Sequence, residues 1–211
     1  MHMLKEVVSG VSLSLLMFIG STSQAFAQDN NLSAKQQVQE KLAKMQSLSA
    51  DFSQTVTADN GDMLQQLTGE LAIQRPNKLR WRTDPPDDTL MIASGDTVWY
   101  YNPFVEQVTL YRQDDAAANS PMLLLLTGSE AQWQDYRVSV TGEDQYLVEQ
   151  IEGSNSLQLT FADDVLQQIR LKQEQGDTIE LSLQDVAINP SLKADLFHFD
   201  IPDGVDVDDQ R

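Results

Sequence analysis

Cysteine is absent from the 211-residue chain, and histidine occurs only twice, as His2 and His198. Without cysteine the fold has no disulfide bonds, so its stability must come from the packing of its secondary structure. No nucleophile-elbow motif is present, and no cluster of residues has the spacing of zinc ligands. We interpret His198 as a structural residue of a strand or loop. These absences argue against an enzyme, and we expect neither a metal nor a cofactor.

Basic residues are also few: 14 lysines and arginines stand against 32 aspartates and glutamates, which gives a net charge of −18. Such a charge repels nucleic acid and anionic membrane surfaces, and it steers the protein toward basic patches on partners. We attribute most of the charge to solubility. Nucleic acid is therefore excluded as a partner, and we expect a monomer.

Long hydrophobic runs are missing as well, and the apolar stretch at residues 7–19 is too short for a membrane-spanning helix. Ala25-Phe26-Ala27 then supplies a small-x-small cleavage pattern. We interpret residues 1–27 as a secretory signal peptide, with an uncleaved membrane anchor as the alternative. No cysteine stands at the cleavage site, so the chain is not expected to be a lipoprotein itself. We expect residues 28–211 to form one domain in a bacterial periplasm.

The hydrophobic pattern predicts one helix followed by a long series of strands. Ser33 and Gln36 have the spacing of a capping box, and Val38, Leu42 and Met45 recur at helical steps. From residue 50 onward the apolar residues alternate with polar ones, and turn residues separate the runs. The fold class we expect is mainly β: a single curved antiparallel sheet of about ten or eleven strands, an incomplete barrel covered by a helical lid.

A second short helix is predicted after Ser120, with Pro121 in its first turn and Gly128 beyond its end. Its residues 122–126 are apolar on every side and cannot face water alone. They form either an ordinary buried helix or a lid over a cavity that a ligand fills. Met122 and Met45 would give such a lid deformable packing.

The apolar residues near the middle of the chain predict the wall of that cavity. Leu71 and Ile73 share one face of a strand by alternation, as do Leu79 and Trp81. From the next two strands we expect Ile92, and Trp99 or its neighbour Tyr100, to join them. With the helices, the predicted cavity residues are Leu42, Met45, Leu71, Ile73, Leu79, Trp81, Ile92, Trp99, Met122, Leu123, Leu125 and Leu126.

Arg75 precedes Pro76 at the end of an apolar strand. It is either a solvated turn residue or a latch that binds the unpaired carbonyls at the end of the short helix with its guanidinium donors. Acidic pairs such as Asp87-Asp88 and Asp163-Asp164 raise the alternative of a glycoside hydrolase or a calcium site. They fall where turns are predicted, and we interpret them as turn residues.

Four segments resemble a known family. RPNKLRW at 75–81, SGDTVWYYNPFVEQVT at 94–109, SPMLLLL at 120–126 and IPDGVDVDDQR at 201–211 are similar to the periplasmic outer-membrane lipoprotein carriers of the Lol system, the LolA family. The resemblance covers the whole mature chain. It implies a half-barrel with a helical lid and a hydrophobic cavity for the acyl chains of lipoproteins.

The resemblance also implies partners and roles. Lipoprotein cargo would come from an inner-membrane ABC lipoprotein-release complex and pass to an outer-membrane receptor of the LolB type. The latch arginine of the family falls on Arg75, and its lid positions fall on Leu42 and on residues 122–126. Leu79 stands where the family often has phenylalanine, which affects a detail of the cavity lining or of handover. The alternatives are a receptor-type protein, a carrier of other lipids and a carboxylate-based hydrolase.

Overall fold

A computed structural model describes residues 32–115 and 133–211. The predicted signal peptide, residues 1–27, and the predicted second helix, residues 122–126, lie outside these ranges. The described residues belong to one unit of the chain, residues 32–211. None of the helices in the described ranges is long and apolar enough to cross a membrane.

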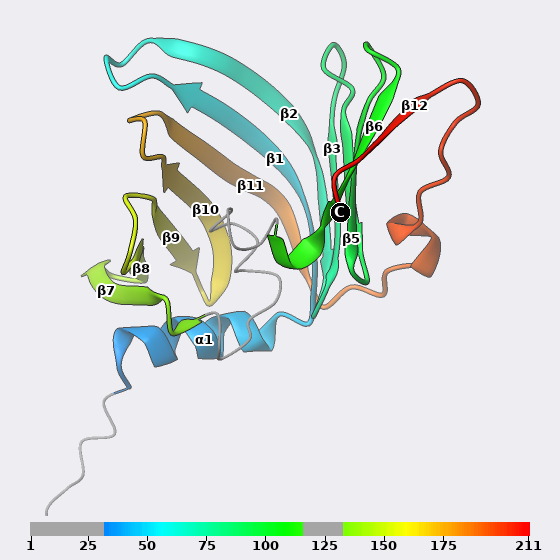
Figure 1. Cartoon of the computed structure of the whole chain (residues 1–211). Helices are drawn as coiled ribbons and strands as arrows, with labels where there is room; N and C mark the ends of the chain where they lie inside the picture. The colour runs from blue at the N-terminus through cyan, green and yellow to red at the C-terminus, as the bar shows by residue number, and fades with distance from the viewer. Residues whose placement is uncertain (1–31, 116–132) are drawn as a thin grey trace, which may run out of the picture. The chain divides into compact units, whose positions relative to one another are not determined.

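Twelve strands form one open sheet in the order β12-β6-β5-β4-β3-β2-β1-β11-β10-β9-β8-β7. Neighbouring strands are antiparallel except β12 and β6, which are parallel. The sheet curves so that β7–β10 and β3–β6 flank the same concave side (Figure 1). The predicted fold class is confirmed. Its elements are α1 (Ala34–Lys44), β1 (Ser47–Thr57), β2 (Met63–Gln74), β3 (Lys78–Thr83), β4 (Leu90–Ser94), β5 (Thr97–Asn102), β6 (Gln107–Arg112), β7 (Tyr136–Gly142), β8 (Gln145–Gln150), β9 (Ser156–Ala162), β10 (Val165–Lys172), β11 (Thr178–Ile188), a 3₁₀ helix η1 (Ala194–Phe197) and β12 (Asp206–Asp209).

Helix α1 begins as its sequence predicts. The Ser33 hydroxyl accepts a hydrogen bond from the backbone of Gln36, and the Gln36 side chain accepts one from the backbone of Ser33. Val38 and Leu42 lie four residues apart on one helical face, and both are fully buried. The helix therefore packs one apolar stripe into the main core, with its polar face outward.

The concave side of the sheet, called the inner face, carries the main hydrophobic core. Direct cross-strand partners point to the same face of a sheet, and the register Leu71–Trp81–Met91 crosses β2, β3 and β4. In the other half of the sheet, Leu159 pairs with Ile169 in the same way. These residues form one cluster with the apolar stripe of α1.

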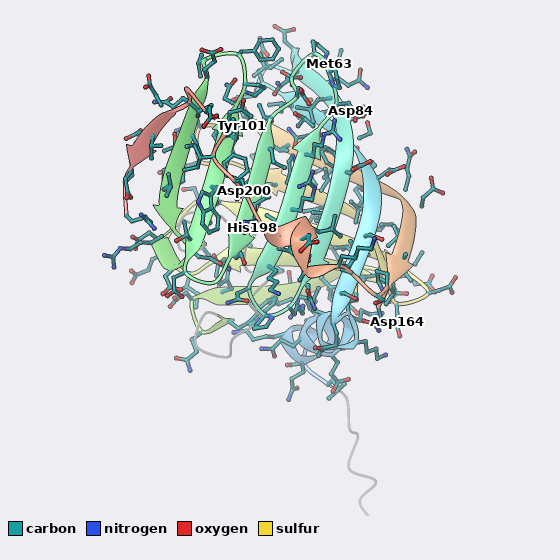
Figure 2. All side chains as sticks on the ribbon, turned by 90° about the vertical axis from the view of Figure 1, so that its right-hand side faces the viewer. Met63, Asp84, Tyr101, Asp164, His198 and Asp200 are labelled. Carbon is teal, nitrogen blue, oxygen red and sulfur yellow. The ribbon has the colours of Figure 1, made fainter. Side chains whose placement is uncertain are left out.

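The opposite side, called the outer face, has a smaller core of its own. Trp99 pairs with Ile92 and Leu110 there. The C-terminal segment covers this region: η1 contacts β3 and β4, and Phe197 is buried. The Phe199 ring packs against that of Tyr101 in a tilted arrangement, with 5.6 Å between the ring centroids. Figure 2 shows Tyr101, His198 and Asp200 close together on this side. His198 is thus part of an exposed segment, within hydrogen-bonding distance of Asp200.

Gly69 makes room for an aromatic pair on the inner face. A Cβ atom at this position would lie 2.7 Å from the Phe52 ring and 2.0 Å from the carbonyl oxygen of Arg82. The Phe52 ring packs against Trp81 with 4.1 Å between centroids. The absence of a side chain at Gly69 is therefore a packing requirement of the inner face.

We expect Gly69→Ala to lower the free energy of unfolding by about 1–3 kcal/mol, because the backbone or the Phe52 ring must move. Urea unfolding followed by circular dichroism measures the change. Gly142→Ala in β7 is the matched control, since its Cβ would meet only the flexible side chain of Gln145. Equal stabilities for the two variants would contradict this packing.

Candidate functional site

The inner face is lined with apolar side chains that are only partly covered. Trp81, Met91 and Ile73 pack against the core cluster but keep part of their surface accessible. Tyr100 and Tyr111 belong to this face through their pairing with Met91 and Val98, and they are 38% and 36% exposed. Single exposed rings are common on soluble domains, but a contiguous exposed apolar patch marks a binding or interaction site. The accessible apolar surface is therefore a candidate binding surface.

One pocket on this face, called the rim pocket, lies at the end of the strands opposite to α1. Its volume is 330 Å³. Leu67, Trp81, Met91, Tyr100 and Phe104 supply its apolar wall, and Gln54, Gln65, Thr83, Asp87, Thr89 and Asn102 supply its polar wall. An apolar ligand with one polar end matches such a lining.

A second pocket, called the helix pocket, has a volume of 280 Å³ and lies against α1. It is lined by Arg75, by Trp133 and by the α1 residues Gln36, Gln39, Glu40, Leu42 and Ala43. Arg75 is half-buried, and its backbone N–H donates to the carbonyl of Gln46 over 2.9 Å. Burial lowers the pKa of its guanidinium, yet an arginine stays charged at pH 7. A cation is thereby held beside the helix that packs on the inner face.

Ion pairs fasten α1 to the turns of the sheet. Lys41 Nζ lies 2.8 Å from Asp144 and 2.6 Å from Asp164, and Lys44 Nζ lies 2.7 Å from Asp164. Hydrogen bonds from Lys41 and Lys44 lower the pKa of Asp164 from 3.8 to about 2. Burial disfavours the charged form of Lys41, but its hydrogen bonds to Asp144 and Asp164 outweigh burial and raise its pKa from 10.5 to about 12.

Sequence reasoning missed the role of Asp164, which it assigned to turn solvation. Both Asp144 and Asp164 have positive φ in tight turns, a conformation that aspartate tolerates. The turn assignment was therefore right. Only the three-dimensional placement of α1 over the turns reveals the ion pairs, because 120 residues separate Lys44 from Asp164.

Six of the twelve predicted cavity residues lie on the inner face, on α1 or at its C-cap. Leu42, Met45, Leu71 and Leu79 are buried in the main cluster, and Ile73 and Trp81 pack against it with partial exposure. Arg75 lies beside α1. The predicted lid residues Met122, Leu123, Leu125 and Leu126 fall outside the described ranges.

The prediction that Ile92 shares this face is wrong, and of the two alternatives Trp99 and Tyr100 only Tyr100 lies on it. Ile92 pairs with Arg80, the neighbour of Trp81, and Trp99 pairs with Ile92, so both point to the outer face. Met91 and Tyr100 take their places on the inner face. The segment Leu90-Met91-Ile92-Ala93 is apolar at every position, because both faces of β4 are covered, so alternation alone could not fix the register.

In the described part of the chain, no group of three or more His, Asp or Glu side chains is placed to hold a metal ion. The acidic pair Asp208-Asp209 has a structural use. Hydrogen bonds from Arg211 lower the pKa of Asp209 to about 2, and the same arginine reaches Thr97 of β5. This carboxylate holds Arg211, which in turn links the C-terminus to β5.

An open sheet with a partly uncovered apolar inner face defines a binding protein for apolar ligands. A solved structure from Thermus thermophilus, titled an uncharacterized conserved protein, shares this fold with a TM-score of 0.52 at 11% identity, over 84% of this chain and 100% of that one.

The particular family follows from sequence. The family model described as "Outer membrane lipoprotein carrier protein LolA" matches residues 43–200. An outer-membrane lipoprotein carrier protein from Idiomarina loihiensis is 47% identical over 84% of this chain and 88% of its own. Another from Psychromonas ingrahamii is 35% identical over 99% of this chain and 100% of its own. The chain therefore belongs to the LolA family, which confirms the resemblance that the four segments indicate.

We expect Asp164→Asn to lower the urea midpoint of unfolding at pH 7, because α1 loses its shared anion. The pKa of Asp164 is lowered in the folded state, so its ionised form stabilises the fold above pH 3.8 and stops doing so as the pH falls through about 2. The difference in urea midpoint between variant and parent should therefore shrink as the pH falls from 3.8 to about 2. Asp163→Asn is the matched control in the same turn, since Asp163 forms no ion pair with the described residues. If both variants unfold like the parent at pH 7, the ion pairs do not anchor α1.

Proposed function

We propose that this protein carries lipoproteins through the periplasm, with their acyl chains packed against the inner face. One observation supports this most: the apolar surface around Trp81, Met91 and Tyr100 is continuous with the core and yet accessible. Membership of a family of lipoprotein carriers supplies the cargo class.

The energetics explain why a shuttle is needed. Burial stabilises an acyl chain by ~0.8 kcal/mol per CH₂, so ~20 methylenes would cost on the order of 16 kcal/mol to move into water. A carrier lowers this cost by replacing the membrane with a protein surface. No bond is made or broken in that transfer, so the function requires no catalytic residue, and we propose no enzymatic activity.

The route and partners follow from the same proposal. An inner-membrane ABC lipoprotein-release complex would load the carrier, and an outer-membrane receptor of related fold would unload it. The carrier would work as a monomer in the periplasm. Transfer must then run downhill in acyl-chain affinity, because ATP would be used only at the release complex.

Arg75 is proposed as the latch of the empty carrier. Its half-buried cation beside Leu42 and Glu40 of α1 supports a role in closing the helix pocket. Residues 122–126 are proposed as the second part of the lid. A closed state favoured 100 to 1 corresponds to ~2.7 kcal/mol, which a few charge-assisted hydrogen bonds supply.

The three tryptophans allow a direct test of the binding face. A lipopeptide with brominated acyl chains should strongly quench a variant that keeps only Trp81, because bromine quenches on contact. A variant that keeps only Trp99 should be quenched weakly, since Trp99 lies on the outer face. Steady-state fluorescence during titration measures both. Equal quenching of the two variants would contradict binding at the inner face.

Removing the latch should favour the open state. We expect Arg75→Leu to bind the lipopeptide up to ~100-fold more tightly, because the closed state no longer competes, and to deliver it less completely to purified receptor. Arg80→Leu on the neighbouring strand is the matched control, since Arg80 points to the outer face. Unchanged affinity and delivery in Arg75→Leu would exclude the latch.

A further inference from the structure

The polar wall of the rim pocket interrupts an otherwise apolar surface. Gln54 pairs with Leu67 on one side and with Leu181, which is fully buried, on the other. Gln65 pairs with Val56 one step nearer the strand ends. Two amides thus stand at positions where alternation favours apolar residues.

These two amides are available to a ligand. The threonines of the pocket already satisfy each other, since Thr89 N–H donates to the Thr83 hydroxyl over 2.8 Å and their hydroxyl oxygens lie 2.9 Å apart. Within the described residues, neither the Gln54 nor the Gln65 side chain has a hydrogen-bond partner in the protein. Each offers two N–H donors and a carbonyl acceptor toward the pocket.

The lining of the pocket contains one carboxylate, that of the half-buried Asp87. A carboxylate there disfavours an anionic ligand group, and the net charge of −18 adds to the effect. Neutral groups with carbonyl oxygens are favoured over phosphates. Rejection by like charge is a common way to obtain specificity between similar ligands.

We propose that the rim pocket binds the uncharged diacylglyceryl-cysteine linkage of a lipoprotein. Gln54 and Gln65 donate hydrogen bonds to its ester and amide carbonyls, and Asp87 disfavours the phosphate of a phospholipid that carries the same acyl chains. This inference rests on the proposed function and adds how the carrier distinguishes its cargo from membrane lipid.

The geometry of the inner face agrees with this assignment. The rim pocket lies at the open ends of the strands, and its accessible apolar wall includes Trp81 and Met91. Acyl chains that start in the rim pocket can therefore lie against these side chains, while the attached polypeptide leaves toward solvent.

The experiment compares three probes with brominated chains, each supplied from cyclodextrin and read by quenching of Trp81. They are an N-acetylated dipalmitoylglyceryl-cysteine peptide, dipalmitoylphosphatidylglycerol, and hexadecane without polar groups. In the Gln54→Leu/Gln65→Leu variant we expect roughly 10-fold weaker binding of the peptide, from the loss of two hydrogen bonds. Binding of hexadecane should stay the same or tighten. Asp87→Asn should strengthen binding of the phosphatidylglycerol several-fold relative to binding of the peptide.

Gln66→Leu is the matched control, because Gln66 is the exposed neighbour of Gln65 on the outer face. Gln65 and Gln66 are exposed, and Gln54 and Asp87 are partly buried, so thermal unfolding of every variant should confirm an intact fold. If the parent protein binds the peptide and the double variant binds it equally, this inference fails and the proposed function stands. If the parent protein binds neither peptide nor hexadecane, both fail.

Discussion

An apolar inner face that spans most of a twelve-stranded sheet is the constraint on which the rest of this structure depends. Hydrophobic surface in water is unfavourable in proportion to its area. In the described residues α1 packs Val38 and Leu42 against this face, and its C-cap Met45 and the buried Trp133 belong to the same cluster. One stripe cannot cover both halves of the sheet, and the side chains farthest from α1, such as Tyr100, stay partly exposed. The apolar surface that α1 leaves uncovered is therefore the same surface that is proposed to bind acyl chains.

The sheet can present this surface because other features hold it together. The outer face is closed by the C-terminal segment, with Phe197 buried against β3 and β4. At one edge, β12 places Asp206, Asp208 and Asp209 along its four residues. Charged side chains on an edge strand discourage pairing with another chain. Acidic residues thus serve the fold at an edge and, through Asp144 and Asp164, at the attachment of α1.

The sequence predicts the elements of this fold well and their faces less well. Local signals sufficed where one interaction decides the outcome, as with the Ser33 capping box and the alternation of Leu71 and Ile73. They failed where both faces of a strand are apolar, which misassigned Ile92 and left the choice between Trp99 and Tyr100 open. They also missed β12, since an acidic tail becomes a strand only through its pairing with β6. The sequence analysis also did not single out Gln54 and Gln65. Their amide side chains occupy inner-face positions where the alternation pattern favours apolar residues.

Those amides bear on how a carrier releases its cargo. A wholly apolar inner face would bind acyl chains most tightly and would keep them. Polar atoms at Gln54, Gln65 and Thr83 line the same pocket as Trp81 and Met91, so part of the contact with a bound chain is less favourable than in hydrocarbon. Covering one of these polar groups lowers the binding free energy little when a ligand carbonyl accepts a hydrogen bond from it. The loss is larger when the ligand has no such group. The mixture therefore lowers affinity for bare hydrocarbon while it retains affinity for an ester-linked lipid, which is the balance that a reversible lipoprotein carrier needs.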